Sequence, residues 1–538
     1  MTAFASRDAI LLLDGLRYLG ISVDAEGAQL KLSAPAGALT PSLQAALRTR
    51  KSSLMAALAA PSGPARARAE LPLSFEQERV WLGQQLAPHS PEFNLALVFR
   101  IDGTLSPEAL GQALTDIALR HEILRTVYVG GTTPAQTVRE PERVPLPIVD
   151  LASIPESDRV RVAERVARAE LHRPFDLQCA MPLRAMLVRL DQRCHWLVIS
   201  RHHIAADGWS LGLFLRELVF AYRAFRLGNA AGLPSPKIQY ARYAVLQRLA
   251  SDDDERARDL DYWRVRLRGA DPIVFPHAVG VRLADAGAVV VRALDPASAR
   301  TFAAWCRDQG VTAFAAYLAA FLVVLAQRSG RRDLLICTDY ANRDSMETES
   351  VIGMFVRRLP LRCELQESWR FLDLARHAKR VTFEACGHAS VPMEIIGRLL
   401  DATRSEGVAR FQVMFGMHGA PAHAPYRDLG LHGTERAELM DLQVATNEFP
   451  LSLYVSDTAD GPVVVLRHDE AVFSKAEADL LLLQLQDLVD ILARGGDPSL
   501  KELQGAAAAA ERKAAANYLT MRARRFGRRA LETTGAQQ

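Results

Sequence analysis

The chain has 538 residues, of which 49% are apolar and 24% are charged, a length and composition typical of a protein with about two to four packed units. Its 65 Lys and Arg residues nearly balance its 62 Asp and Glu residues, and a net charge of +3 argues neither for nor against a nucleic-acid partner. We expect no nucleic-acid partner. The six cysteines are scattered and include no CxxC pair, which argues against a zinc site or a disulfide framework and suits a reducing compartment. No metal is expected.

The start of the chain lacks a basic segment followed by an apolar run, so no secretion signal is expected. The longest apolar stretches, such as residues 312–326, are too short for a bilayer span of about 20 residues. We therefore expect a cytoplasmic protein that has no membrane contact.

Residues 1–60 are predicted to form a small separate unit. Apolar residues at helical spacing end at Gly20, and two alternating runs on either side of Glu26-Gly27 predict a hairpin. Thr40-Pro41 then predicts the start of one helix that runs to about Ala59. The order helix, hairpin, helix favours an interaction module over a decorative extension.

The rest of the chain divides into a predicted linker at residues 61–70, two comparable lobes at 71–265 and 266–504, and a tail at 505–538. Strands and helices alternate in both lobes, which predicts an α/β fold. The predicted strands cover residues 98–101, 183–190, 196–200, 334–338, 359–363, 411–415, 451–455 and 463–466. The predicted helices cover residues 107–121, 211–222, 298–309, 312–327 and 474–493. The alanine-rich, basic tail is predicted to be a solvated terminus rather than a helix that meets an acidic partner.

One segment has the residue types for acyl transfer: residues 202–210 read His-His-Ile-Ala-Ala-Asp-Gly-Trp-Ser, between a predicted buried strand and a helix. Ser210 is expected to cap that helix, whose free N–H groups favour negative charge, and Gly208 to allow a tight turn. A histidine at this junction can reach both the proton of a nucleophile and an oxyanion. Because neighbouring strand residues face opposite sides, one histidine is expected to face a cleft and the other to be structural.

Asp207 has several possible roles. It could be a nucleophile or a general acid, or it could ligate a metal with His203, although the sequence offers no evident third ligand. A buried carboxylate needs a partner, so we expect Asp207 to pair with an arginine and to hold the loop.

This segment resembles the central motif of the condensation domains of nonribosomal peptide synthetases, and further family motifs follow the family order over about residues 71–500. The matching stretches are residues 74–82, 120–126, 240–244, 352–359, 388–394 and 410–415. The chain departs from the family pattern at Glu76 (usually Ala), Arg242 (usually Asp), Leu246 (usually Trp) and Arg357-Arg358 (usually Asn-Thr). Residues 1–60 resemble the N-terminal docking domains of hybrid synthetase subunits, on residues 12–20, 30–35 and 39–41.

The resemblance implies two lobes similar to chloramphenicol acetyltransferase, arranged in a V with a tunnel at their junction, plus a small α+β docking domain. It implies that donor and possibly acceptor carrier proteins present substrates on phosphopantetheine, that the chain itself binds no cofactor, and that residues 1–60 capture the C-terminal peptide of an upstream subunit. Carried over, His203 is the catalytic residue. The supporting residues are His202, Asp207, Gly208, Trp209, Ser210, Arg125 and Arg343, the expected partner of Asp207. Arg357, Arg358 and Met414 are candidates for the tunnel wall, and the two arginines could instead face solvent.

The implied function is amide-bond formation between a carrier-bound acyl or peptidyl thioester and an amine. Two alternatives remain: an inactive platform that recruits carriers or a tailoring enzyme, and a chain-releasing acyltransferase that uses a free amine or alcohol. Gly208-Trp209-Ser210 speaks against an epimerisation domain, and His202 speaks against a heterocyclising relative.

Overall fold

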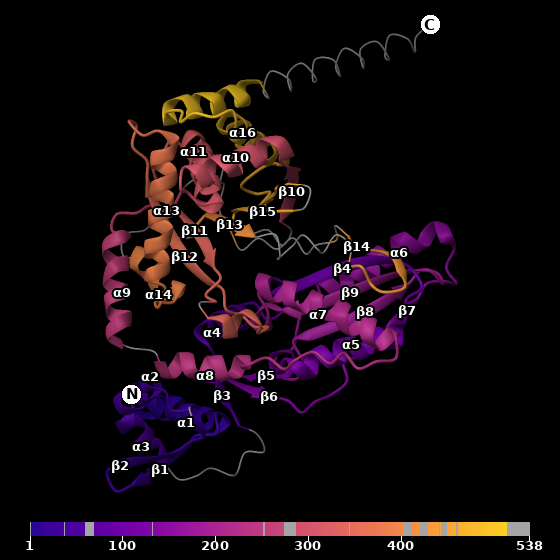
Figure 1. The fold of residues 1–538 in the computed structure, drawn as a ribbon, viewed down its shortest axis with the longest axis vertical. Coiled ribbons are helices and arrows are strands. Elements are labelled where there is room, and N and C mark those ends of the chain that lie inside the picture. The colour runs from indigo at the N-terminus through magenta and orange to yellow at the C-terminus, as the bar shows by residue number, and fades with distance from the viewer. Residues whose placement is uncertain are drawn as a thin grey trace.

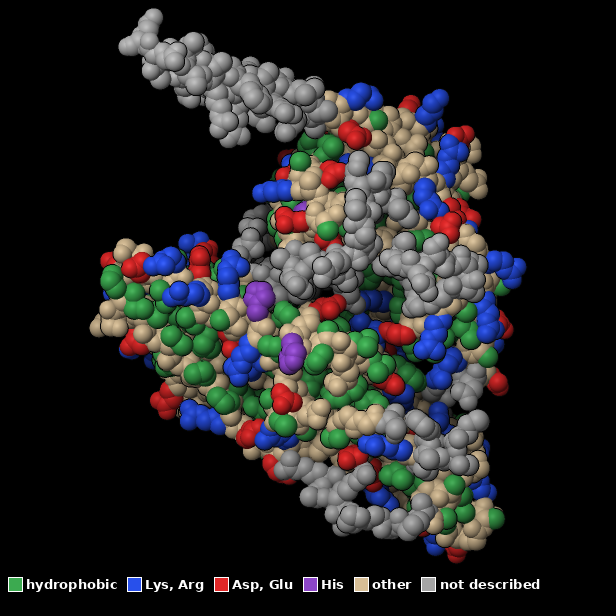
Figure 2. All heavy atoms as spheres, turned by 180° about the vertical axis from the view of Figure 1, so that it is seen from behind, with side chains coloured by type: hydrophobic (Ala, Val, Ile, Leu, Met, Phe, Trp, Pro, Cys, Tyr) green, Lys and Arg blue, Asp and Glu red, His purple; other side chains and the backbone are tan. Residues whose placement is uncertain are grey.

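The structure is a computed structural model that describes residues 2–36, 38–59, 69–131, 133–250, 253–273, 287–343, 345–401, 411–418, 429–440, 442, 449–458 and 461–513. Two lobes, each built around one large sheet, lie above a small N-terminal unit (Figure 1). On the rear face a recess separates the lobes, and basic and acidic side chains lie together in it (Figure 2). The predicted linker falls mostly on residues outside the described ranges.

The N-terminal unit consists of helices packed beside one hairpin. Its elements are α1 (Thr2–Tyr18), β1 (Ser22–Glu26), β2 (Gln29–Ser33), α2 (Pro41–Thr49) and α3 (Lys51–Ala59). Gly27 has a φ of 60°, which suits the tight turn of the hairpin, and the side chain of Thr40 caps α2 by accepting from the Leu43 N–H at 3.3 Å. The single helix predicted up to Ala59 is wrong. The chain breaks at Arg50, and the break turns Leu54 and Ala57 onto the core under α1.

The N-terminal unit shares its core with the N-lobe. Helix α8 (Tyr240–Ala250) and strand β3 (Leu71–Pro72) contribute Leu71, Ala241, Val245 and Leu249 to the same apolar cluster as the residues of α1. Gly15 of α1 lies so close to Val245 that an added Cβ would be 2.8 Å from a valine methyl group. The N-terminal unit therefore packs directly against α8 and is not joined to the N-lobe by the linker alone.

Replacing Gly15 by valine is expected to lower the free energy of unfolding by about 1–3 kcal/mol, because the new side chain overpacks the seat on α8. Denaturant unfolding measures this effect. Asp8→Val, at an exposed position of the same helix, should cost much less, and adding Val245→Ala to Gly15→Val should restore part of the loss. An unchanged loss in the double variant would mean that the two residues do not meet.

The N-lobe sheet has the strand order β14-β4-β9-β8-β7. Its elements are β4 (Asn94–Gly103), β7 (Ile148–Asp150), β8 (Leu183–Arg189), β9 (Cys194–His202) and β14 (Thr434–Leu439), with α5 (Pro107–Arg120) and α7 (Gly208–Arg226) on one face and α6 (Glu156–Leu171) on the other. All nine residues of β9 are buried, because both faces of the sheet are covered. The central strand thus provides a rigid mount for the residues that follow it.

The two lobes are not two consecutive stretches of chain, as a boundary at residue 265 implied. Strand β14, from the C-terminal half, pairs antiparallel with β4 and completes the N-lobe sheet. Residues Val351, Ile352, Met354 and Phe355, also from that half, belong to the N-lobe core. The second crossing places residues from the C-terminal half beside the start of α7, which follows the end of β9.

The C-lobe sheet has the strand order β10-β16-β15-β13-β11-β12. Its strands are β10 (Ala288–Ala293), β11 (Asp333–Tyr340), β12 (Arg357–Glu364), β13 (Val413–His418), β15 (Leu451–Ser456) and β16 (Val463–His468). The helices of this half are α9 (Asp253–Arg266), α10 (Pro296–Asp308), α11 (Ala313–Ser329), α12 (Met346–Glu349), α13 (Phe371–Gly387), α14 (Met393–Asp401) and α16 (Lys475–Ala493). Helix α11 is the core helix of the lobe, with every residue from 315 to 326 buried.

Part of the predicted tail is folded. Residues 500–513 form a helix whose Leu503, Ala507 and Ala510 are buried, so the alanine run belongs to the C-lobe; the remainder of the tail lies outside the described residues. Along the described part of the chain, no single helix has the length and apolarity to cross a membrane. Among the described helices, only α10 and α11 taken together have that length and apolarity, and the chain bends by 112° between them.

The remaining described elements belong to the N-lobe. They are α4 (Phe75–Leu86), the 3-10 turns η1 (Glu122–Arg125) and η2 (His203–Ala205), and strands β5 (Thr126–Val129) and β6 (Ala135–Val138), which form a small sheet with β3. Helix α4 packs against η2, the turn that holds His203. This contact brings α4 to the candidate site.

Candidate active site

His203 is the first residue after β9, and its ring is fixed through one nitrogen. Its backbone N–H donates to the Phe93 carbonyl at 2.8 Å, and its Nδ1 lies 2.8 Å from the Ala206 carbonyl. A carbonyl only accepts, so Nδ1 carries the hydrogen and Nε2 of the neutral ring carries a lone pair. Burial, and then the cationic Arg79 and Arg358, lower the pKa of His203 to about 4. The imidazole is therefore neutral at pH 7, and the residue keeps partial exposure to solvent.

His202 has a different environment. Its Nδ1 accepts from the Ile204 N–H at 3.1 Å, and its Nε2 lies 3.0 Å from the Gln84 amide oxygen, so both ring nitrogens are used inside the protein. The ring is completely buried between Phe93 and Phe175, and burial is the main cause that lowers its pKa to about 3. Among the described residues, the two nitrogens of His202 both have partners, whereas Nε2 of His203 has none and is the nitrogen that could meet a substrate.

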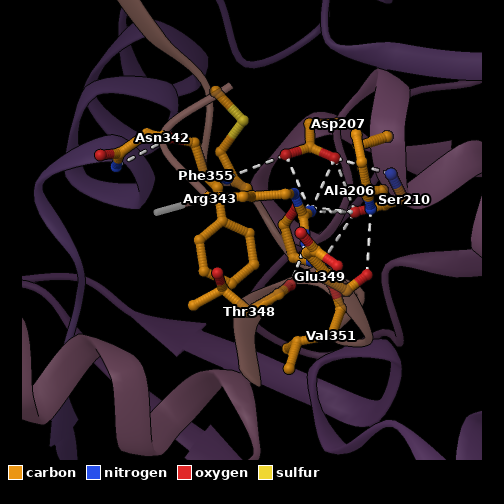
Figure 3. A network of polar contacts seen from close by, with 12 residues as sticks. Ala206, Asp207, Ser210, Asn342, Arg343, Thr348, Glu349, Val351 and Phe355 are labelled. Atoms are coloured by element: carbon orange, nitrogen blue, oxygen red, sulfur yellow. Dashed lines mark hydrogen bonds and ion pairs between the residues drawn. The ribbon is translucent and has the colours of Figure 1, made fainter. Parts of the chain in front are cut away.

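Asp207 is a fully buried carboxylate in the centre of a polar network (Figure 3). Both of its oxygens lie 3.1 Å from the Arg343 guanidinium, and it accepts from the Ser210 N–H at 2.8 Å and the Phe355 N–H at 3.1 Å. The ion pair predicted with Arg343 is present. The prediction that Ser210 caps α7 is wrong, because Asp207 is the N-cap and Ser210 donates to it from the third helical position.

The network around Asp207 joins the two halves of the chain. Arg343 also donates to the Val351 carbonyl at 2.8 Å, and its guanidinium lies 4.1 Å from the centre of the Phe355 ring. The Ser210 hydroxyl accepts from the Gly353 N–H at 3.0 Å, and Trp209 Nε1 donates to the Glu349 carbonyl at 3.0 Å. Residues 349–355 are thereby held against the start of α7, close to His203.

The other predicted site residues lie in separate places. Gly208 begins α7. Met414 of β13 is buried in a small apolar cluster with Cys337 and Phe449. Arg125 is not part of the Asp207 network: it bonds the Arg139 carbonyl and lies 3.6 Å from Glu122, which in turn binds Tyr18 of the N-terminal unit. The prediction that Arg125 supports the site is therefore wrong, because η1 lies against the N-terminal unit and not against the Asp207 network.

Arg357 is only partly exposed and binds residues of other elements. Its Nε lies 2.6 Å from Glu76 of α4, and it also donates to the Ala389 carbonyl at 2.7 Å. Gln247 of α8 donates to the same carboxylate at 2.8 Å. Glu76 and Arg357 are thus two departures from the family pattern that compensate each other across the lobes. Their opposite charges were the only sign of this pairing in the sequence.

A double-mutant cycle tests the compensation. Glu76→Ala leaves the Arg357 guanidinium without its carboxylate and is expected to cost about 2 kcal/mol of stability. The double variant Glu76→Ala with Arg357→Asn, which removes both charges, should unfold closer to wild type in denaturant. Additive losses in the cycle would show that the pair contributes no coupling.

The described residues contain no group of three or more His, Cys, Asp or Glu side chains that could hold a metal ion. Asp207 is occupied by Arg343 and by the start of α7, which leaves it unsuited to ligate a metal with His203. The arrangement instead offers a neutral imidazole, fixed in one tautomer, at the junction of two lobes.

This two-lobe architecture is that of condensation domains. Residues 67–513 match the family model of the condensation domain, and residues 10–59 match that of the TubC N-terminal docking domain. The chain belongs to the condensation-domain family of nonribosomal peptide synthetases and carries a TubC-type docking domain at its N-terminus. The family and the fold class predicted from the sequence are confirmed.

Two relatives are large synthetases. The chain is 31% identical over 438 residues to the chondramide synthase cmdD of Chondromyces crocatus, covering 80% of this chain but 11% of the relative. It is 35% identical over 355 residues to the phosphinothricin tripeptide synthetase PhsC of Streptomyces viridochromogenes, covering 64% of this chain and 32% of the relative. The chain therefore spans only a minor part of these relatives.

Solved structures show the same fold. The X-domain from teicoplanin biosynthesis is 27% identical, with a TM-score of 0.68 over 82% of this chain and 98% of the other. The X-domain in its complex with OxyB matches equally well, at 27% identity. The first condensation domain of the calcium-dependent antibiotic synthetase has a TM-score of 0.67 at 20% identity, covering 81% and 99% of the two chains.

Proposed function

We propose that this chain is an acyltransferase that joins a carrier-bound acyl or peptidyl thioester to an amine, with His203 facing the attacking nitrogen. The observation that carries the proposal is the His203 ring, whose Nδ1 is bound to Ala206 while Nε2 is left with a lone pair. Both substrates come from outside the chain, the donor on phosphopantetheine. Residues 1–60 receive the C-terminal peptide of the upstream subunit that delivers it.

The reaction needs one proton acceptor. The amine attacks the thioester carbonyl and forms the C–N bond, and Nε2 of His203 takes the proton that the nitrogen releases. Collapse of the tetrahedral intermediate breaks the C–S bond, and the departing pantetheine thiolate recovers the proton. An α-amine has a pKa of about 8, so part of it is neutral at cellular pH, and holding both substrates in one cleft supplies much of the rate.

Reconstitution tests this function. The full chain is mixed with an upstream carrier loaded with a donor and with amine acceptors, both carrier-bound and free, and products are detected by mass spectrometry. An amide adduct that requires the chain supports the proposal. Its absence with every acceptor, while the carriers remain loaded, would contradict it.

The second candidate is a recruitment platform. The similarity to an X-domain, which is known in a complex with OxyB, favours it. The neutral, partly exposed His203 beside an intact Asp207 network favours catalysis, since a platform needs neither. Turnover in the reconstitution separates the two.

The pH dependence of kcat/KM should follow the acceptor and not His203. Because the pKa of His203 is lowered to about 4, its Nε2 stays unprotonated throughout the range in which an α-amine gains its proton. Activity should fall below the pKa of the acceptor amine, and a less basic acceptor should move this acid limb to lower pH. A limb that stays near pH 6.5 with both acceptors would show that the imidazole titrates normally.

A further inference from the structure

Helix α8 lies between the N-terminal unit and the N-lobe (Figure 1). One of its faces, here called the docking face, belongs to the core of the N-terminal unit through residues spaced by four: Ala241, Val245 and Leu249. Tyr240, Tyr243 and Gln247 follow one another at spacings of three and four, so at 3.6 residues per turn they lie on the opposite face of the helix. The two faces of α8 therefore contact two different parts of the chain.

The docking face is closely packed. Gly15 of α1 lies so near to it that an added Cβ would be 2.8 Å from a methyl group of Val245. Position 246 is usually tryptophan in the family, and here the smaller Leu246 packs against the core of the N-terminal unit. At the end of α1, the Tyr18 hydroxyl donates to Glu122 of η1, a turn that contacts α8. The N-terminal unit thus fixes both α8 and the turn beside it.

On the opposite face, Tyr240 fixes a segment from the C-terminal half of the chain. Its ring fills the space beside Gly353, where an added Cβ would be 1.9 Å from a ring carbon, so a side chain larger than glycine would not fit. Its hydroxyl donates to the Met354 carbonyl, and its ring lies 4.9 Å from that of Phe355 in a T-shaped arrangement. The course of residues 353–355 is therefore set by a side chain of α8.

Tyr243 holds the turn that leads to Arg343. Its hydroxyl accepts from the Asn342 side-chain amide at 3.1 Å, and the same amide donates to the Phe355 carbonyl at 3.2 Å. Asn342 has a φ of 52°, in the left-handed region that few residues other than glycine adopt. The Tyr243 and Phe355 rings lie 4.6 Å apart. Both contacts of α8 with this turn converge on Phe355 and on the residue before Arg343.

The residues that α8 holds are those that hold the loop behind His203 (Figure 3). The Phe355 N–H donates to Asp207 at 3.1 Å, and Arg343 pairs with the same carboxylate. Asp207 follows Ala206, whose carbonyl lies 2.8 Å from Nδ1 of His203 and fixes the ring. Because a packed interior has few voids that could absorb a movement, a displacement of α8 would be passed on to the imidazole.

On the basis of the function proposed above, we propose that Tyr240 and Tyr243 are positioning residues and that the N-terminal unit fixes them through the docking face of α8. The docking domain then has a second role besides the capture of an upstream peptide, because it maintains the geometry in which His203 meets the acceptor amine. The rate of acyl transfer depends on this packing even when the donor needs no docking. A domain that only recruits would affect only the delivery of the donor.

A donor that bypasses docking tests the proposal with the full chain. The acyl group used in the reconstitution is supplied on free pantetheine, which carries no docking peptide. Gly15→Val, which overpacks the docking face, should lower kcat per folded molecule about fivefold or more and change KM little, since a misplacement of about 1 Å can cost about 100-fold. Gly15→Ala, which adds only the Cβ, should have a smaller effect in the same direction and carries the test if Gly15→Val does not fold.

Two further variants provide the controls. Adding Val245→Ala to Gly15→Val restores space on the docking face and should recover most of kcat, whereas Asp8→Val, at an exposed position of α1, should keep the wild-type kcat. Wild-type kcat in both Gly15 variants overturns the inference and leaves the amide-forming function standing. An equal loss in Asp8→Val, or no recovery in the double variant, overturns the assignment to α8.

Hydrogen exchange gives a readout that needs no turnover. The Gly353 and Phe355 N–H groups bond to Ser210 and Asp207, so residues 351–356 should exchange faster in the Gly15 variants, while strand β11 should exchange as in wild type. If the wild-type chain forms no amide, the proposed function fails and this comparison decides the inference. Faster exchange confined to residues 351–356 supports it, and unchanged exchange overturns it.

Discussion

Replacing His203 by alanine is expected to lower the rate of amide formation by about 10²- to 10⁴-fold, the usual contribution of a positioned proton acceptor. Within the described part of the chain, the substitution removes one ring hydrogen bond, that to the Ala206 carbonyl, and the residue is partly exposed, so the fold should survive. Single-turnover rates with loaded carriers, measured beside thermal unfolding, check both halves of this expectation.

His202→Ala is the matched control. This ring makes two internal hydrogen bonds and is completely buried between two phenylalanines, so its loss should cost at least about 2 kcal/mol of stability through a cavity and unsatisfied partners. The two variants should therefore show opposite patterns, one losing rate and the other losing stability. Wild-type turnover in His203→Ala would refute the proposed role of its imidazole.

Local features of the site could be predicted from the sequence. The order strand, two histidines, aspartate, helix fixes which residues emerge at the end of β9, because strand alternation separates the two histidines. The rule that a buried carboxylate needs a partner led to the Asp207–Arg343 pair, which the structure contains at 3.1 Å. The prediction that Ser210 is the N-cap of α7 was wrong because Asp207 and Ser210 are both good capping residues, and only the backbone geometry decides between them.

Contacts between distant parts of the chain could not be predicted. The Glu76–Arg357 pair joins residues 281 positions apart, and a single sequence carries no distance information across such a span. The same holds for β14, which crosses into the N-lobe sheet, and for α8, whose Val245 completes the core of the docking domain. The departures at positions 76 and 357 were visible as anomalies, and their pairing needed the fold.

Asp207→Ala is expected to destabilise the protein by about 3–5 kcal/mol, the usual cost of removing one partner from a buried ion pair. The Arg343 side chain is 2% exposed and would lose its only carboxylate partner in the described network, and the Ser210 and Phe355 N–H groups would lose their acceptor. Denaturant unfolding measures the loss. Asp207→Asn, which keeps an acceptor oxygen but no charge, should have a free energy of unfolding between those of Asp207→Ala and wild type.

The same pair of variants decides between the roles that the sequence left open for Asp207. A nucleophile or general acid must reach the substrate, so its removal would abolish turnover and leave stability almost unchanged. Asp207 is fully buried, and its two oxygens are already occupied by a guanidinium and two backbone N–H groups. Because these donors surround the carboxylate and no solvent reaches it, Asp207 has no free edge from which it could touch a substrate. We therefore expect the loss of rate in Asp207→Ala to match the loss of folded protein. A variant that is stable but inactive would instead show that Asp207 takes part in the reaction directly.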